Sequence, residues 1–150
     1  MIQSLKNETL VTETNPYAAA TIAAVTNGTI IDLDSPTEGS FDSVRFILSP
    51  GIVLATGTIL MKAYCGNEAA LGDGAYATTQ VLVTAPTPTT KSSKPISLDV
   101  IRPGKRYVRL DYTLAAANTA INCVLAERYN SKIIPTTLPN SDSKISVGMA

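Results

Sequence analysis

The sequence predicts an all-β protein, an antiparallel β-sandwich or jelly roll of about eight strands. Short segments alternate apolar and polar side chains with a period of two, which is the pattern of half-buried strands. Glycine, proline and asparagine separate these segments at short intervals. No long segment shows the periodicity of an amphipathic helix. At 150 residues, residues 1–150 are expected to form a single domain.

The N-terminal part is predicted to contain an arm and a hairpin. Residues 1–16 are polar and unpatterned, so we expect an extended arm of the kind that reaches a neighbouring subunit. Residues 20–26 and 29–34 are predicted strands. Asn27 and Gly28 between them are a strong signal for a two-residue hairpin turn.

An acidic loop follows at residues 34–40, where proline, glycine and short polar side chains disfavour helix and strand. Four carboxylates surround it: Asp32, Asp34, Glu38 and Asp42. Their spacing does not match an EF-hand, so a solvated acidic turn is expected rather than a calcium site.

The middle of the chain supplies three further predicted strands, at residues 41–49, 58–65 and 75–84. Residues 66–74 contain three glycines, match no phosphate-binding motif, and are expected to be a flexible turn. Residues 85–95 are rich in proline, threonine, serine and lysine, which predicts a long loop or linker.

The C-terminal part contains the clearest strands. Residues 96–101 alternate as a strand, and residues 102–105 suit a type II turn. Residues 106–129 are predicted to form two long strands, a hairpin joined near residues 116–118 at the centre of the sandwich. Residues 130–150 are expected to be an extended tail.

The two long strands differ in their patterns. The first places four apolar side chains on one face: Val108, Leu110, Tyr112 and Leu114. The second is nearly apolar on both faces until Glu127 and Arg128, as expected for a strand deep in a sheet.

The chain is poor in charge. Charged residues make up 16% of it, whereas soluble domains average about 25%. Either the surface is a neutral, threonine-rich β surface, or much of it lies in subunit contacts, whose cores are depleted of charge. The formal net charge is zero, which argues against a nucleic-acid partner. The N-terminus lacks the pattern of a signal peptide, and no apolar run is long enough for a membrane helix.

Catalysis is not expected. The chain has no histidine, so it lacks the commonest general base and metal ligand. The Ser92-Ser93-Lys94 run lies in a predicted loop, a poor place to lower the pKa of a lysine. Cys65 and Cys123 lie in apolar runs without metal-ligand spacing, so two buried free thiols are expected; a disulfide between them remains an alternative. We therefore predict no catalytic residue, no metal, no cofactor and no small-molecule substrate.

Basic residues gather around the predicted central hairpin. They are Arg102, Lys105, Arg106, Arg109 and Arg128. One interpretation is ion pairing with Asp99, Asp111 and Glu127 on neighbouring strands. The other is a binding surface for an anionic partner, which makes these five residues the candidate interface.

The order of these features carries a resemblance to a known family. An acidic turn, a strand and a Gly/Asp loop precede ISLDVIRPGKRYVRLDYT, and a closing strand ends in AERY. This order resembles small structural proteins of tailed-bacteriophage virions, several of which are capsid decoration or cement proteins on the outside of an icosahedral shell. The resemblance is clearest over residues 96–129, weaker over residues 41–84, and does not cover the arm or the tail.

The resemblance implies a structural role in the virion. A cement protein stabilises the shell by bridging capsomers, so its implied partners are the major capsid protein and further copies of itself, as dimer or trimer. The resemblance further implies that the chain is made in the bacterial host cytoplasm and is located at the capsid surface. Two alternatives remain: another virion component, such as a head-fibre base, tail part or receptor-binding module, and a non-viral β-sandwich interaction module.

Overall fold

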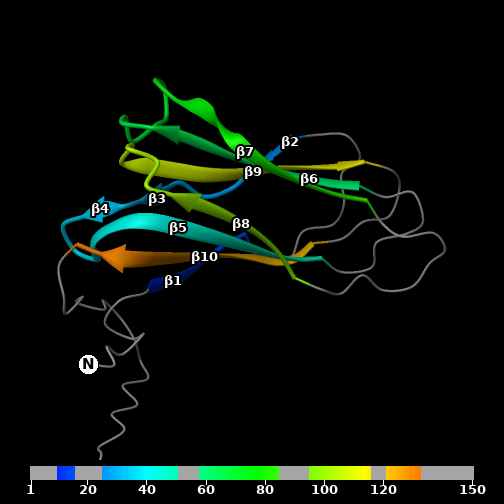
Figure 1. Cartoon of the computed structure of the whole chain (residues 1–150), viewed down its shortest axis with the longest axis horizontal. Helices are drawn as coiled ribbons and strands as arrows, with labels where there is room; N and C mark the ends of the chain where they lie inside the picture. The colour runs from blue at the N-terminus through cyan, green and yellow to red at the C-terminus, as the bar shows by residue number, and fades with distance from the viewer. Residues whose placement is uncertain (1–9, 16–24, 51–57, 85–94, 116–120, 133–150) are drawn as a thin grey trace, which may run out of the picture.

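The computed structural model describes residues 10–15, 25–50, 58–84, 95–115 and 121–132. Their strands form two antiparallel sheets that lie one above the other (Figure 1). Sheet A contains β1 (Leu10–Asn15), β10 (Ile121–Ser131), β5 (Gly39–Pro50), β4 (Asp34–Ser35) and β8 (Ile96–Ile101). Sheet B contains β2 (Val25–Asn27), β3 (Ile31–Asp32), β9 (Tyr107–Ala115), β6 (Thr58–Gly66) and β7 (Ala75–Thr84). Across these described ranges, no helix is long and apolar enough to cross a membrane.

The strand pairing is that of a jelly roll. With the short strands β3 and β4 set aside, sheet A has the order β1-β10-β5-β8 and sheet B the order β2-β9-β6-β7. The pairs are nested along the chain: β1 with β10, β2 with β9, β5 with β8, and β6 with β7. Such nesting results when one long hairpin is rolled into two packed sheets. The predicted antiparallel, all-β sandwich is therefore confirmed.

The core lies between the two sheets. The four apolar side chains predicted to share one face of β9 are all buried there. They meet inward-facing side chains of sheet A, including Val44, Phe46, Leu48, Leu98 and Val124. Each large apolar side chain so buried contributes roughly 1.5–3 kcal/mol relative to an exposed one.

The predicted central hairpin is wrong in its pairing. β9 and β10 are both inner strands, but β9 pairs with β6 in sheet B and β10 pairs with β5 in sheet A. The chain therefore crosses between the sheets after β9; the predicted connection at residues 116–118 lies outside the described residues. Sequence alternation identifies a strand but not its partner, and both strands here pair with segments far away in the chain.

The predicted turn at Asn27 and Gly28 is also wrong. Both β2 and β3 pair with β9, from Val25 opposite Thr113 to Asp32 opposite Tyr107. The amide of Gly28 donates to the carbonyl oxygen of Leu110 at 2.8 Å, so the backbone stays beside β9 instead of reversing. Both segments form backbone hydrogen bonds with the same edge of β9, and this pairing outweighs the local preference for a turn. Residues 20–24 of the predicted strand lie outside the described part.

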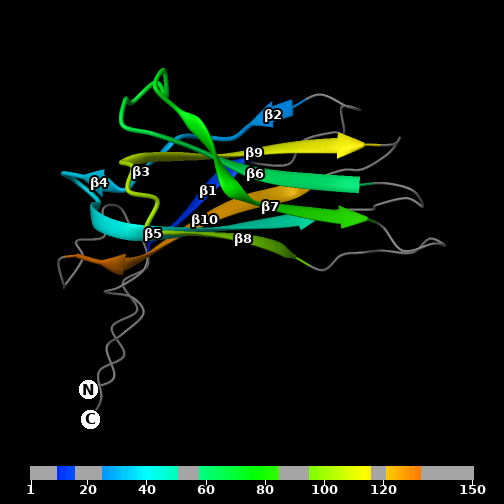
Figure 2. The ribbon, with the colours of Figure 1, turned by 45° about the horizontal axis from the view of Figure 1, so that its top comes forward.

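Three segments expected to be irregular contain strand residues. Residues 10–15 of the predicted arm are β1, an edge strand beside β10 (Figure 2). In the predicted loop at residues 34–40, β4 pairs with the first residues of β5. At the other end of the chain, β10 continues to Ser131 and thus takes the first residues of the predicted tail.

Candidate interaction surfaces

Basic and acidic side chains meet at one end of the sandwich. Arg106 donates from Nε and Nη2 to the two carboxylate oxygens of Asp32, at 2.9 and 2.8 Å. Arg102, on the turn between β8 and β9, donates from Nε to Oδ2 of Asp42 at 3.3 Å. The acidic loop and the basic cluster, which are separate features of the sequence, therefore neutralise each other in the fold. We call this region the charged end.

Arg128 belongs to the charged end but not to its surface. Its side chain is 2% exposed. Nη1 donates to Oε2 of Glu38 at 2.6 Å and to the carbonyl oxygen of Asp32 at 3.1 Å, while the guanidinium lies 5.5 Å from the centroid of the Phe41 ring. Arg128 thereby joins β10 of sheet A to the segment that leaves sheet B at β3. The sequence alone does not predict that this arginine is buried, because the groups that it contacts lie far away in the chain.

The electrostatics of Asp32 reflect this arrangement. Partial burial acts to raise the pKa of its carboxyl group. The hydrogen bonds from Arg106 and from the Asp34 amide, together with the nearby positive charges, outweigh burial and hold the pKa below its ordinary value. The carboxylate form is therefore the one that the charged end stabilises.

A hollow of about 440 Å³ opens at the charged end. Its lining includes Arg102, Lys105, Arg106 and Lys132. Of the five predicted interface residues, Lys105 alone forms no ion pair with any carboxylate in the described ranges. The charged end thus keeps exposed cations at Lys105 and Lys132, and binding of an anionic partner there stays a prediction.

The fifth predicted residue, Arg109, lies elsewhere, on the outer face of sheet B. It donates from Nε and Nη2 to both oxygens of Asp111, at 2.6 and 3.0 Å. The Tyr76 hydroxyl donates to the same carboxylate at 3.1 Å, and Asp111 is 2% exposed as a result. Arg109 also lies over the Tyr64 ring, and Tyr64 packs edge-on against Tyr76 with centroids 4.9 Å apart. Arg109 therefore pairs with Asp111 within β9, and not across neighbouring strands as predicted.

The outer face of sheet A has a different make-up. Arg45 on β5 donates from Nε to Asp99 on β8 at 3.0 and 3.2 Å, and its Nη1 lies 3.7 Å from Glu127 on β10. The Tyr129 hydroxyl donates to Asp99 at 3.2 Å. Asp99 and Glu127, expected to pair with the basic cluster, thus pair with Arg45, because Arg45 is their direct neighbour in both strand registers.

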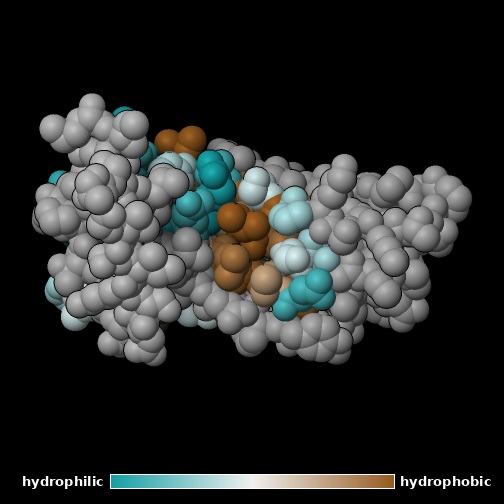
Figure 3. Space-filling view, turned by 90° about the horizontal axis from the view of Figure 1, so that it is seen from below, coloured by the Kyte–Doolittle hydropathy of each residue, from teal (hydrophilic) through white to brown (hydrophobic). Residues whose placement is uncertain are grey.

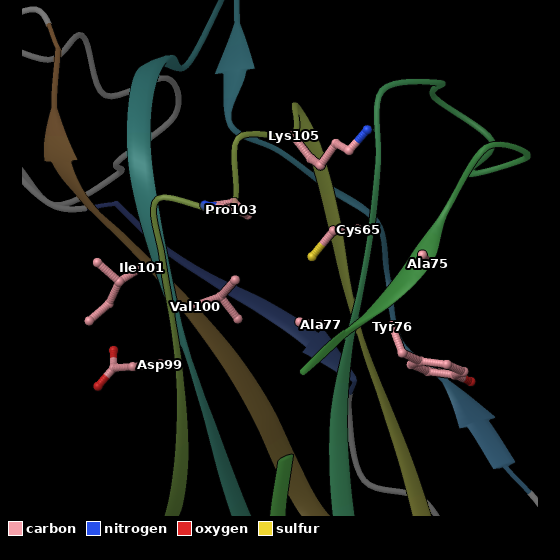
Figure 4. A pocket seen from close by; sticks show the side chains of 9 residues that line it. All are labelled: Cys65, Ala75, Tyr76, Ala77, Asp99, Val100, Ile101, Pro103 and Lys105. Atoms are coloured by element: carbon pink, nitrogen blue, oxygen red, sulfur yellow. The ribbon is translucent and has the colours of Figure 1, made fainter. Parts of the chain in front are cut away.

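A second hollow, of about 340 Å³, lies between the edge strands β7 and β8. Figure 4 shows Cys65 and Val100 pointing toward each other across it. Burial raises the pKa of the Cys65 thiol, which keeps it protonated and unreactive. Cys65 is a buried free thiol, as predicted, whereas Cys123 is half-buried and belongs to the other sheet. Both cysteines are free, so the alternative of a disulfide between them is not realised.

The Gly/Asp loop at residues 66–74 is held by its own hydrogen bonds. The Asp73 carboxylate accepts from the amides of Asn67 and Glu68 at 2.9–3.0 Å. These bonds lower the pKa of Asp73. Gly74 packs so closely on Tyr64 that an added Cβ would overlap the ring. The loop that was expected to be a flexible turn therefore packs against the outer face of sheet B.

Among the described residues, no group of three or more Cys, Asp or Glu side chains is placed to hold a metal ion.

No protein-family model matches the chain, and no curated protein matches it. Two solved structures of infectious bursal disease virus resemble it. One is the VP2 subviral particle, at 10% identity and a TM-score of 0.44; the other is the Gt strain, at 8% and 0.41. Each likeness covers 81% of this chain but 32% of the matched chain, so this chain spans about a third of their length. Likeness at this level says nothing about function.

Proposed function

We propose that this chain is a structural protein of a bacteriophage virion, a cement protein that binds the outside of an icosahedral capsid and bridges its capsomers. Its partners would be the major capsid protein and further copies of itself. It would be made in the host cytoplasm and reside on the capsid surface. The proposal assigns it no reaction and no cofactor.

The observation that carries the proposal is the use of arginine. All five arginines form ion pairs with carboxylates, and four of them connect different segments of the fold. These pairs tie segments of the described sandwich to one another, and among the described residues the cations outside them are Lys62, Lys105 and Lys132. A protein that resists pressure on a shell needs this kind of internal cross-linking, whereas an enzyme needs polar groups directed into a cleft.

The sequence adds support that is independent of the fold. Jelly rolls serve as viral capsid domains, as lectins and as cupins, so the fold alone does not select a function. The resemblance over residues 96–129 is what favours the virion among these uses. Of those residues, 96–115 and 121–129 are described, and they lie in β8, in the charged end and in the two inner strands β9 and β10.

The test is cosedimentation of the purified chain with capsids assembled from the major capsid protein of its virus. We expect saturable binding and a higher melting temperature of the capsid, because repeated contacts add avidity. Capsids of an unrelated phage serve as the control. A chain that stays in the supernatant at tens of micromolar would contradict the proposal.

One observation favours an alternative, a receptor-binding part of the virion. Tyr76 is 49% exposed and, with Tyr64, forms an aromatic pair flanked by Lys62 and Arg109. Exposed aromatic rings beside cations can stack on sugar rings or bind acidic groups. Binding on a glycan array that is lost in Tyr76→Ala would support this alternative. A non-viral interaction module remains the third interpretation, and capsid binding would exclude it.

A further inference from the structure

The outer face of sheet A carries an apolar centre. Leu125 on β10 lies directly opposite Ile47 on β5, and both side chains point away from the core, because their neighbours Val124, Phe46 and Leu48 point into it. Figure 3 shows hydrophobic surface in the middle of the described part of this face, with hydrophilic groups at its borders.

The flanks of this centre are partly apolar as well. On the same face of β8, Ile101 is 66% exposed, and it lies in one cross-strand row with Ser43 and Tyr129. Between this row and the apolar centre runs the row of Glu127, Arg45 and Asp99. Tyrosine and arginine beside aliphatic side chains are the composition typical of interface cores.

We propose that this face binds the same face of a second copy of the chain. This inference rests on the proposed function, which includes binding between copies of the chain, and it assigns that binding to the outer face of sheet A. The occupant is a second copy because the face is complementary to itself under a twofold axis that runs parallel to the strands, between β5 and β10. Such an axis exchanges the two strands, so each residue of β5 meets the second copy's counterpart of its own cross-strand neighbour.

The charges agree with this symmetry. Arg45 would meet Glu127 of the second copy, because the two are cross-strand neighbours within one chain. Within the chain, Arg45 is 3.7 Å from Glu127 but 3.0 Å from Asp99, so Glu127 is the less engaged of its two partners. Ile47 would meet Leu125 in the same way. Arg45 would not face Arg45 of the second copy, and Glu127 would not face Glu127. The apolar centre would be covered.

The available area is adequate for a weak to moderate dimer. β5 and β10 contain 12 and 11 residues, and the flanking β1 and β8 contain 6 each. At about 3.3 Å per residue and about 4.8 Å between strands, the face covers roughly 550 Å² in projection, before the relief of side chains is added. Stable interfaces bury about 800 Å² per partner, so one complete face approaches this size.

Cys123 makes the proposal testable on the unmodified chain. It is a free thiol on β10, half-buried, and paired in register with Ser49 of β5 on the same sheet. In the proposed dimer it would lie against Ser49 of the second copy and lose access to reagents. Cys65 is the internal control, because it is buried between the sheets of each copy.

The experiment measures the iodoacetamide labelling rate of each cysteine by mass spectrometry from about 1 to about 100 µM protein, beside the solution mass by light scattering. We expect the mass to rise from monomer to dimer and Cys123 labelling to slow at least tenfold over the same range, with Cys65 unchanged. A monomer at every concentration would overturn the inference, and so would a dimer in which Cys123 labelling is unaffected.

The two proposals fail separately. A chain that pellets with capsids but stays monomeric by light scattering would refute the second-copy interface and leave the cement function standing. A chain that dimerises with protection of Cys123 but ignores capsids would do the reverse.

Discussion

The outer faces of the two sheets differ in how completely their charged and apolar side chains are covered. On sheet B, Arg109 and Tyr76 cover Asp111 so completely that the carboxylate is almost inaccessible. On sheet A, Arg45 is shared between two partly exposed carboxylates, and the apolar pair beside it, Ile47 and Leu125, is half-buried on the outer face. The described polar side chains of sheet B thus cover one another, whereas sheet A keeps an apolar pair beside its ion pairs, the surface on which we place the second copy.

The difference shows that paired charges on a sheet can serve two purposes. A largely buried pair such as that of Arg109 and Asp111 makes the loss of either partner costly, since the remaining charge is mostly shielded from water. A shallow pair such as that of Glu127 contributes little to stability, because solvent screens it. Such a partly exposed pair can be replaced by contacts with another protein molecule at a small cost in free energy, which suits an interface.

The largest effect is expected from breaking the buried pair on sheet B. Asp111→Ala should lower the free energy of unfolding by about 2–4 kcal/mol, because it removes the carboxylate that Arg109 and Tyr76 both contact. The matched change on sheet A, Glu127→Ala, should cost less than about 1 kcal/mol. Urea denaturation at a concentration where the chain is monomeric measures both. Equal losses would remove the distinction between the two faces.

A smaller loss is expected from crowding the sheet B face. Gly74→Ala places a Cβ against the Tyr64 ring and within 2.9 Å of the Leu71 carbonyl oxygen. We expect a loss of about 1–3 kcal/mol, because the ring must shift. Gly72→Ala is the control, because its Cβ would meet only the mobile end of Glu68. Self-association should survive both changes, and a variant that is folded but has lost it would place the interface on sheet B instead.

The smallest effect concerns two tyrosines, one on each face. Burial, followed by the nearby carboxylate, raises the pKa of Tyr76 beside Asp111 and of Tyr129 beside Asp99. The neutral phenol is favoured in the folded state, so the stability it contributes is present below the ordinary tyrosine pKa of about 10 and is lost as the pH rises through the folded value. Ultraviolet titration of Asp99→Asn should show a lower pKa for Tyr129 with Tyr76 unchanged. A shift of both tyrosines, or of neither, would contradict this assignment.

Sequence reasoning identified strands where alternation is strong. The side chains of Val108, Leu110, Tyr112 and Leu114 lie on one buried face as predicted. A period of two determines which side chains of a strand share a face, whichever strand it pairs with. Pairing was not predictable in the same way. β10 has apolar side chains on both faces, and a register shift between Ile121 and Cys123 changes which of them point inward. Cys123 and Leu125 therefore lie on the outer face, which the sequence does not reveal.

The candidate surfaces were predictable only in part. The sequence predicted that Arg102, Arg106 and Arg128 gather at one end of a central hairpin; the hairpin is wrong, and their carboxylate partners come from a segment at least 60 residues away. Ion pairs across such distances depend on the nesting of the strands, which local patterns do not encode. The charge-poor composition left two interpretations open, a neutral, threonine-rich surface or subunit contacts, and our proposal follows the second by placing a contact at the apolar centre of sheet A.

The most direct test of this account compares the same substitution on the two outer faces. Ile47→Lys places a charge in the centre of the sheet A face, and Leu60→Lys places one at a half-buried outer position of sheet B. Sedimentation velocity at one concentration, with circular dichroism to establish folding, should find Ile47→Lys monomeric and Leu60→Lys dimeric like the parent chain. If both variants dimerise, or if only Leu60→Lys becomes monomeric, the outer face of sheet A is not the surface that joins two copies.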